Sequence, residues 1–255
     1  MFIPLHDANG LEHIKRQYVT LALIALNVIV FVATGLGGQS YLQANAYGLG
    51  YTPVVLYDGQ PTPPFLYVPE IFTYVTYSFL HGDILHLGGN MLFLWVFGDN
   101  IEDALGHLRY LLFYLCCAVA GAWLHGFVQP GSNIPLIGAS GAVAGIVAAY
   151  LILHPKVKVW VLVLMRVPLR LPAFIPLLFW VGFQVVMFFA ADGQTVSWPA
   201  HVGGIVTGAI LVIMLRRRGV PLFDRQIVTP EAVDIAKDGN PEIQEKRQVM
   251  RWGRQ

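Results

Sequence analysis

Charged residues are scarce in this chain. Only 12% of its 255 residues are Asp, Glu, Lys or Arg, and 56% are hydrophobic, whereas a soluble domain carries roughly 25% charged residues. Of the 16 basic and 15 acidic residues, 15 in all lie in positions 216–255. This distribution excludes a soluble globular protein, a disordered chain and a β-barrel porin, whose strands alternate apolar with polar residues. A helical membrane protein with a short charged tail remains.

Cysteine is almost absent. Cys116 and Cys117 are adjacent and lie inside an apolar run, which excludes a disulfide framework or a zinc site. Because the chain also lacks an H-E-x-x-H motif, we expect neither a metal nor a cofactor. The net charge of +1 gives no basic field for nucleic acid. The first apolar run, from about Tyr18, is too long for a signal peptide and is interpreted as a membrane span.

Six segments are apolar enough to be membrane spans, each of which needs about 20 residues. They cover approximately residues 18–36, 84–100, 108–128, 138–153, 173–191 and 199–215. No Lys or Arg lies in the connecting segments 37–83, 129–137 and 192–198. By the positive-inside rule, both termini are therefore expected in the cytoplasm. The predicted fold is an all-α membrane protein, a bundle of six transmembrane helices.

The chain divides into three parts on this basis. Residues 1–17 form a cytoplasmic N-terminal segment, residues 18–215 the six-helix domain, and residues 216–255 a charged, flexible cytoplasmic tail. Within the domain, residues 37–83 form a long extracytoplasmic loop whose Tyr residues suit the membrane interface. The apolar stretch Val157–Met165 is too short for a seventh span, so we expect a hairpin or surface segment there.

Polar residues inside the predicted spans lie in one layer. His86 and Asn90 are four apart and share a helix face in span two, Ser140 opens span four, and His201 opens span six. These three spans all run from outside to inside. At 1.5 Å per residue, the four side chains lie roughly 3–10 Å below the outer helix ends. Polar groups at such a depth are costly and usually face the interior of a bundle.

Glycines predict that spans four and six touch. Gly141 and Gly145, and likewise Gly204 and Gly208, form small-xxx-small faces that allow two helix backbones to approach closely. His201 shares a face with Gly204 and Gly208 at spacings of three and four. Ser140 is therefore expected to meet His201.

A serine beside a neutral imidazole is the nucleophile and general base of acyl transfer. The developing oxyanion also needs hydrogen-bond donors, for which the backbone N–H of Ser140 and the side chains of His86 and Asn90 are candidates. The acidic residues near span two lie at its opposite end or at the outer mouth. A Ser–His dyad is therefore the simpler hypothesis.

These residues resemble the rhomboid family of intramembrane serine proteases. The matching text is His81-x4-His86-x3-Asn90, Gly138-Ala139-Ser140-Gly141 and Ala200-His201-x-x-Gly204-x-x-x-Gly208, in family order. The resemblance implies Ser140 as nucleophile, His201 as base, and His86, Asn90 and the Ser140 amide around the oxyanion, with His81 and the motif glycines in supporting positions. It also implies a water-filled cavity open to the extracytoplasmic side, with residues 173–198 controlling lateral entry of substrate.

Two positions depart from the family pattern. Some members carry Trp-Arg in the first loop, where this chain has Phe72 and Thr73, which bears on the stability of that loop. Some members also have a tyrosine four residues after the serine that stacks on the base, where this chain has Ala144. His201 must then be held by other packing.

The expected function is hydrolysis of a peptide bond in or near a transmembrane segment of another protein, in a lipid bilayer that we expect to be a bacterial inner membrane. The oligomeric state and the substrate are open. A catalytically silent rhomboid-like protein that binds transmembrane clients is the alternative, although the presence of both Ser140 and His201 argues against it. A transporter would show internal repeats, which are not evident, and a metalloprotease would need a metal-binding motif.

Overall fold

A computed structural model describes residues 2–57, 64–163, 166–190 and 196–223. Most of the predicted flexible tail, residues 224–255, lies outside the described residues, as do residues 191–195 of the segment expected to control substrate entry.

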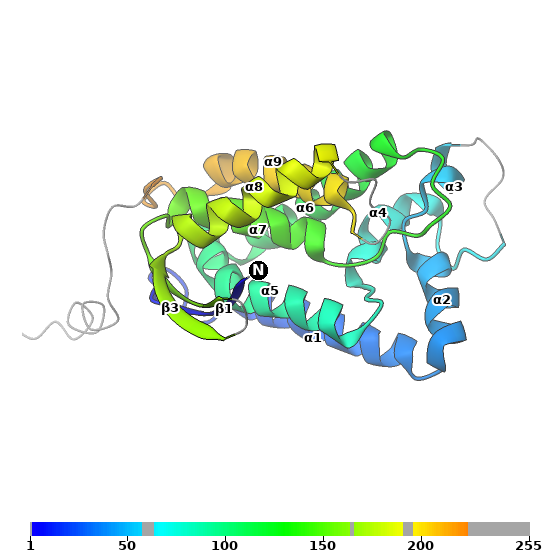
Figure 1. Ribbon diagram of the computed structural model, residues 1–255, viewed down its shortest axis with the longest axis horizontal. Coiled ribbons are helices and arrows are strands. Elements are labelled where there is room, and N and C mark those ends of the chain that lie inside the picture. The colour runs from blue at the N-terminus through cyan, green and yellow to red at the C-terminus, as the bar shows by residue number, and fades with distance from the viewer. Residues whose placement is uncertain (1, 58–63, 164–165, 191–195, 224–255) are drawn as a thin grey trace, which may run out of the picture.

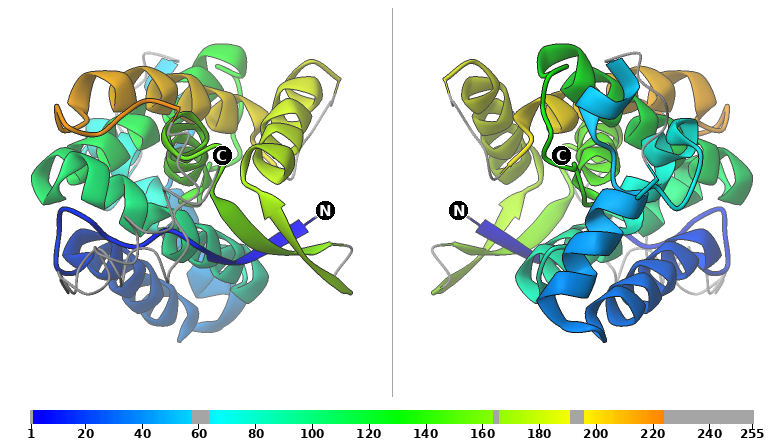
Figure 2. Two further views of the ribbon diagram at one scale, coloured as in Figure 1. Left: turned by 90° about the vertical axis from the view of Figure 1, so that its left-hand side faces the viewer. Right: turned by 90° about the vertical axis from the view of Figure 1, so that its right-hand side faces the viewer.

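Six long helices occupy the positions of the six predicted spans. They are α1 (Tyr18–Gly35), α5 (Ile84–Leu105), α6 (His107–Val128), α7 (Ser140–Leu153), α8 (Phe174–Ala190) and α9 (Trp198–Leu215). They run along the long axis of the molecule (Figure 1). α7 lies inside the ring made by the others (Figure 2), and every residue from Gly141 to Tyr150 is buried. The bundle is therefore built around α7.

The long loop between the first two of these helices is ordered by short helices of its own. They are α2 (Gly38–Leu49), α3 (Pro53–Tyr57), α4 (Thr73–Thr76) and the 3₁₀ turns η1 (Glu70–Phe72) and η2 (Tyr77–Phe79). The Tyr77 hydroxyl donates to the carbonyl of Ala118 in α6 at 2.8 Å, and Tyr51 pairs through its backbone with Leu136. The loop is therefore attached to the bundle at the end opposite the strands (Figure 1).

The expectation of an all-α fold is wrong in one respect, because the opposite end carries a small sheet. Strands β1 (Phe2–Asp7), β2 (Lys158–Val163) and β3 (Val167–Pro172) form an antiparallel sheet in that order. In β2 the side chains alternate, with Val159 and Val161 buried and Trp160 exposed, which is the period of a half-buried strand. The predicted hairpin is thus confirmed, and the N-terminal segment completes its sheet.

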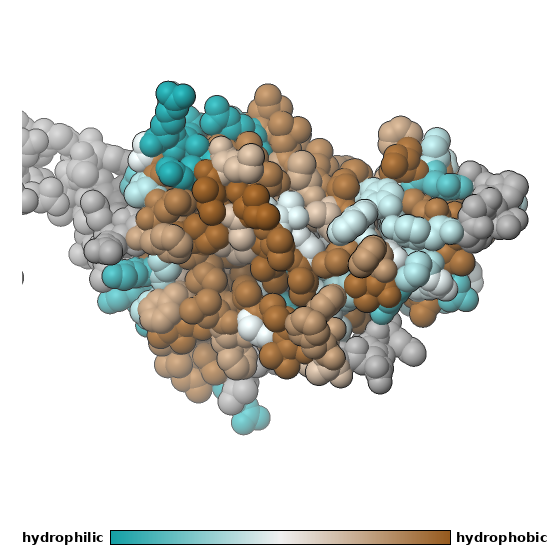
Figure 3. Space-filling view, turned by 90° about the horizontal axis from the view of Figure 1, so that it is seen from above, coloured by the Kyte–Doolittle hydropathy of each residue, from teal (hydrophilic) through white to brown (hydrophobic). Residues whose placement is uncertain are grey.

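Three helices of the described chain, α1, α6 and α9, are long and apolar enough to cross a membrane. The shorter α7 and α8 are also apolar, while the second half of α5 carries Asp99, Glu102 and Asp103. A short α7 is compatible with a bundle because its neighbours cover it. The surface over α8 and α9 is a broad hydrophobic area with hydrophilic residues toward its ends (Figure 3). The chain is therefore a multi-pass membrane protein, and the count of six crossings stays a prediction.

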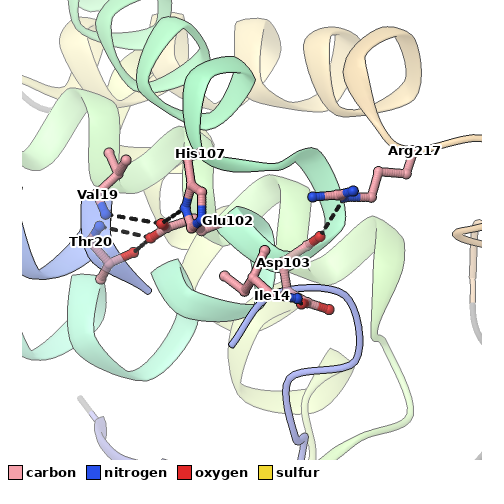
Figure 4. A network of polar contacts seen from close by, with 7 residues as sticks. All are labelled: Ile14, Val19, Thr20, Glu102, Asp103, His107 and Arg217. Atoms are coloured by element: carbon pink, nitrogen blue, oxygen red, sulfur yellow. Dashed lines mark hydrogen bonds and ion pairs between the residues drawn. The ribbon is translucent and has the colours of Figure 1, made fainter. Parts of the chain in front are cut away.

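Acidic residues near the end of α5 hold the N-terminal part of the chain (Figure 4). The Glu102 carboxylate accepts from the backbone N–H groups of Val19 and Thr20 at 2.9 and 2.8 Å. It thereby satisfies donors that the first turn of α1 leaves free. The Asp103 carboxylate accepts from three successive backbone N–H groups, those of Glu12, His13 and Ile14. These buried charges explain why α5 has a polar end.

Asp7 makes a second connection at the same end of the molecule. Its carboxylate oxygen Oδ2 accepts from the Tyr150 hydroxyl of α7 at 2.7 Å and from the Asn100 side chain of α5 at 2.8 Å. Burial and the neighbouring Asp99 raise the pKa of Asp7 to about 8, so this carboxyl carries a proton over much of the neutral pH range. Strand β1 is thereby fixed to the two helices that carry the predicted site residues Asn90 and Ser140.

The backbones of α7 and α9 approach each other closely. A Cβ atom added to Gly204 would overlap the carbonyl oxygen of Gly141, and one added to Gly208 would overlap that of Gly145. Because both contacts join residues with the same separation in the sequence, the two helices run parallel and in one register. Their N-terminal ends, at Ser140 and Trp198, therefore lie side by side.

Replacing Gly204 by alanine should destabilise the protein. The added methyl meets rigid backbone, so we expect a loss of about 1–3 kcal/mol or more in the free energy of unfolding. Thermal unfolding of the purified protein in detergent measures it. Gly182→Ala is the matched control, because a Cβ there meets open space. Equal midpoints for Gly204→Ala and wild type would contradict the contact.

Candidate active site

The serine and the histidine predicted to meet are in hydrogen-bonding contact. Ser140 is the first residue of α7 and His201 lies in the first turn of α9, so the parallel packing of these helices brings the two together. The Ser140 Oγ atom lies 2.9 Å from His201 Nε2. His201 is buried, with 8% of its surface exposed.

Local structure fixes both helix starts. Gly138 has φ +119°, a conformation that residues with a Cβ rarely adopt, and its N–H donates to the Tyr77 carbonyl at 3.0 Å. The chain thus turns sharply into α7 just before the serine. At the start of α9, the Ser197 hydroxyl accepts from the Ala200 N–H at 3.2 Å, as an N-cap residue does. Pro199 occupies the first turn, where its fixed φ suits a helix start.

The two side chains predicted to bind an oxyanion have different surroundings. His86 lies against the turn before the serine, because a Cβ added to Gly138 would be 2.6 Å from His86 Nε2 and 3.8 Å from Ser140 Oγ. Asn90 instead contacts His81, with its side-chain nitrogen 3.1 Å from His81 Nε2. The structure therefore places His86 beside the turn that carries the serine, whereas Asn90 contacts the supporting residue His81.

His201 is held by two side chains of α8 that the sequence analysis did not identify. Gln184 Oε1 lies 2.8 Å from His201 Nδ1. The Trp180 ring stacks near the imidazole, with centroids 6.2 Å apart and planes at 28°. Trp180 also packs against the small cluster that contains Ala144. The indole therefore supplies the packing that the alanine at this position cannot.

A sequence signal for one of these residues exists. Gln184 is the one polar side chain in α8, and a polar residue in an apolar helix is usually directed into the bundle. Trp180 has no such signal, because α8 contains several large apolar residues and only the fold shows which one faces α9.

A cavity of about 1040 Å³ opens over the serine–histidine pair. Its polar lining includes Ser140, His201, His86, Asp83, His125 and Ser197. The loop of residues 128–137 supplies much of the remaining wall. A volume of this size lies at the upper limit of the range typical of small-molecule sites.

The acidic residue at the mouth of this cavity has another role. The Asp83 carboxylate accepts from the Leu85 and His86 backbone N–H groups, each at 2.8 Å, and so caps α5. Asp192, which the sequence places just before α9, lies outside the described residues. Within the described chain, the side chain bonded to His201 Nδ1 is thus an amide.

His125 joins two helices. Its Nδ1 lies 2.8 Å from the Ser197 hydroxyl, which links α6 to the cap of α9. In the part of the chain that the structure describes, no cluster of three His, Cys, Asp or Glu residues could hold a metal ion.

The geometry supports nucleophilic chemistry. A carbonyl oxygen such as Gln184 Oε1 only accepts hydrogen bonds, so the proton of a neutral His201 lies on Nδ1. Nε2 is then free to accept the Ser140 proton, which is how a general base activates a hydroxyl. The backbone N–H of Ser140 is also free of an intrahelical partner, since it belongs to the first turn of α7.

The chain is similar in sequence to known proteins of one family. A family model described as the Rhomboid domain matches residues 68–218. The chain is 29% identical over 153 residues to the yeast "Rhomboid protein 1, mitochondrial", covering 56% of this chain and 42% of that protein. It is 26% identical over 223 residues to "RHOMBOID-like protein 12, mitochondrial" of Arabidopsis thaliana, covering 81% and 61%. It is 27% identical over 200 residues to "Rhomboid protease GlpG" of Serratia proteamaculans, covering 77% and 62%.

The alignments thus span about two-fifths to three-fifths of the lengths of these relatives. Their names point to mitochondria in two cases and to a bacterial protease in the third, and a further relative is named chloroplastic. The relatives therefore do not support the expected bacterial inner membrane.

Replacing Gly138 by alanine should slow the reaction of Ser140 with a fluorophosphonate. The substitution places a methyl group against His86 in a strained backbone conformation, which costs about 1–3 kcal/mol. Labelling followed over time in detergent should therefore be about tenfold slower or more. Gly35→Ala, where a Cβ meets open space, should label at the wild-type rate. Wild-type labelling of Gly138→Ala would show that the turn does not constrain the site.

Proposed function

Because the chain belongs to the rhomboid family, we propose that it is an intramembrane serine endopeptidase that cleaves a peptide bond in or near a transmembrane segment of its substrate. The single observation that carries this proposal is the 2.9 Å contact between Ser140 Oγ and His201 Nε2 under a large cavity. This distance is the one expected between a nucleophile and its base, which supports the proposal.

The proposed reaction proceeds in two steps. Ser140 Oγ attacks the substrate carbonyl carbon while His201 Nε2 takes the hydroxyl proton. The tetrahedral intermediate collapses when that proton passes to the leaving amine, which breaks the peptide bond and leaves an acyl group on the serine. A water molecule, deprotonated by His201, then attacks the ester carbonyl carbon. His201 returns the proton to Ser140 Oγ as the bond between this oxygen and the acyl carbon breaks, which releases the acid and restores the serine. The cavity supplies room for this water beside the serine.

The oxyanion that forms in each step is proposed to lie at the start of α7. The Ser140 backbone N–H points out of the helix end, where the helix dipole also favours negative charge. His86 is close enough to Gly138 and Ser140 to donate a second hydrogen bond. Asn90 is proposed to be a third donor or, through its contact with His81, a support for this group of side chains.

The membrane arrangement follows from charge. We propose that the six long helices all cross the bilayer, with both termini in the cytoplasm and the cavity open to the extracytoplasmic side, since the loops near the cavity lack Lys and Arg. The broad apolar surface over α8 and α9 (Figure 3) then faces lipid, and a transmembrane substrate reaches the site from the bilayer.

Replacing Ser140 by alanine should abolish cleavage of a reporter that carries a transmembrane segment, because the variant lacks the proposed nucleophile. The protein should still insert and fold, since the contact between α7 and α9 does not involve the hydroxyl. Cleavage is measured in proteoliposomes, and fluorophosphonate labelling should be lost in parallel. Ser40→Ala, which alters an exposed serine of α2, should retain both activities.

Cleavage by Ser140→Ala at the wild-type rate would remove this mechanism. Wild-type protein that binds the transmembrane reporter without labelling or cleavage would instead indicate a silent client-binding protein.

Replacing Asn90 by alanine should lower kcat by about 10- to 1000-fold, the range expected for loss of one oxyanion donor. His81→Ala should lower kcat as well, because it leaves the Asn90 amide without its partner. A double variant that is no slower than the slower single variant would show that the two act as one unit. Wild-type kcat for Asn90→Ala would exclude the residue from the site.

A further inference from the structure

Helix α8 buries very few of its side chains. Only Pro176, Leu177 and Gln184 are buried in it, and Gln184 is 3% exposed. Burying an amide in apolar surroundings is costly unless it is hydrogen-bonded. Gln184 meets that requirement through the 2.8 Å contact with His201 Nδ1. The one polar side chain of α8 is therefore directed at the base.

This contact selects one form of the imidazole. A neutral histidine carries its proton on either Nδ1 or Nε2, and the hydrogen bond made by one nitrogen decides the state of the other. With Gln184 Oε1 as acceptor, Nδ1 holds the proton and Nε2 presents a lone pair to Ser140, 2.9 Å away. In the other form Nε2 would hold the proton and could not accept the one from serine.

The same face of α8 also restricts the orientation of the ring. Trp180 lies one turn before Gln184, so both side chains project from one side of the helix. Its indole faces the imidazole at 28° with centroids 6.2 Å apart, while Trp198 meets the ring nearly at a right angle, at 6.0 Å. Stacking and the hydrogen bond thus constrain His201 together.

We propose that Gln184 is a positioning residue, which acts through His201 by holding its Nδ1–H and so keeping Nε2 available to Ser140. Only the kinetic consequence of this proposal depends on the function proposed above. α8 contributes no charge at this place, since Gln184 and Trp180 are both neutral. The titratable groups near His201 from the other helices are Ser140 of α7, His86 of α5, which interacts with it electrostatically, and His125 of α6, which is bonded to the α9 cap.

A spectroscopic test measures the proposed state without any substrate. In ¹⁵N-histidine-labelled protein, the ring nitrogen shifts of His201, assigned by comparison with His201→Gln, should show Nδ1 protonated and Nε2 unprotonated at neutral pH. Gln184→Met has nearly the same shape but no acceptor, so its spectrum should show a mixture of both forms. Val186→Ala alters the exposed face of the same helix and should leave the His201 signals unchanged. A Gln184→Met spectrum identical to wild type would overturn the proposal.

A kinetic test adds the catalytic consequence. Gln184→Met should lower kcat on the order of 10- to 100-fold, the size seen when a group that orients a functional imidazole is lost, with KM within about twofold. Gln184→Glu keeps an acceptor and should recover most of the rate at high pH. Because a carboxylate favours the protonated imidazole, the acidic limb of its pH–rate profile should move to higher pH.

The two tests separate this proposal from the proposed function. Cleavage by wild type together with unchanged kcat in Gln184→Met would overturn the role of Gln184 and leave the protease intact. Loss of rate in Gln184→Glu equal to that in Gln184→Met, with an unmoved pH profile, would also overturn it. If wild type cleaved no reporter, the proposed function would fail, and the spectra would still decide whether Gln184 sets the form of His201.

Discussion

The direct contact between the backbones of α7 and α9 is the constraint on which the rest of this structure depends. Two helices can approach so closely only where both lack side chains, and the glycine pairs Gly141–Gly204 and Gly145–Gly208 meet that condition in a single register. The register makes the helices parallel and brings their first turns together. The positions of Ser140 and His201 are therefore determined by glycines, which have no reactive side chain.

The polar groups of the bundle are divided between its two ends by the same arrangement. α7 is surrounded along its length, so polar side chains occur at its ends rather than in its middle. At one end Glu102 and Asp103 bind backbone N–H groups of the N-terminal part of the chain, and Asp7 joins β1 to α5 and α7. At the other end of the bundle, Ser140 and His201 line the cavity.

Features that depend on the spacing of residues along a single helix could be predicted from the sequence. The six long helices, the parallel glycine faces and the layer of Ser140, His201 and His86 all follow from spacing along single helices. Partners supplied by a different element are not accessible in this way, which is why the sheet of β1 with β2 and the stacking of Trp180 on His201 were not predicted. The position of Asn90 shows the limit of such predictions, because its contact with His81 depends on how the preceding loop folds back.

An amide beside His201, the proposed base, suits a site that we propose to lie in the membrane. A carboxylate placed at Gln184 would have to lose its water in a medium of low dielectric constant, at a cost of several kcal/mol that its attraction to an imidazolium only partly offsets. Such a carboxylate would also gain no ion pair while the imidazole of His201 is neutral. Glutamine provides the one property that the base needs, a fixed acceptor for Nδ1–H, without introducing a charge. Because α8 is otherwise apolar and largely exposed, a neutral side chain is also compatible with the proposed position of this helix in lipid.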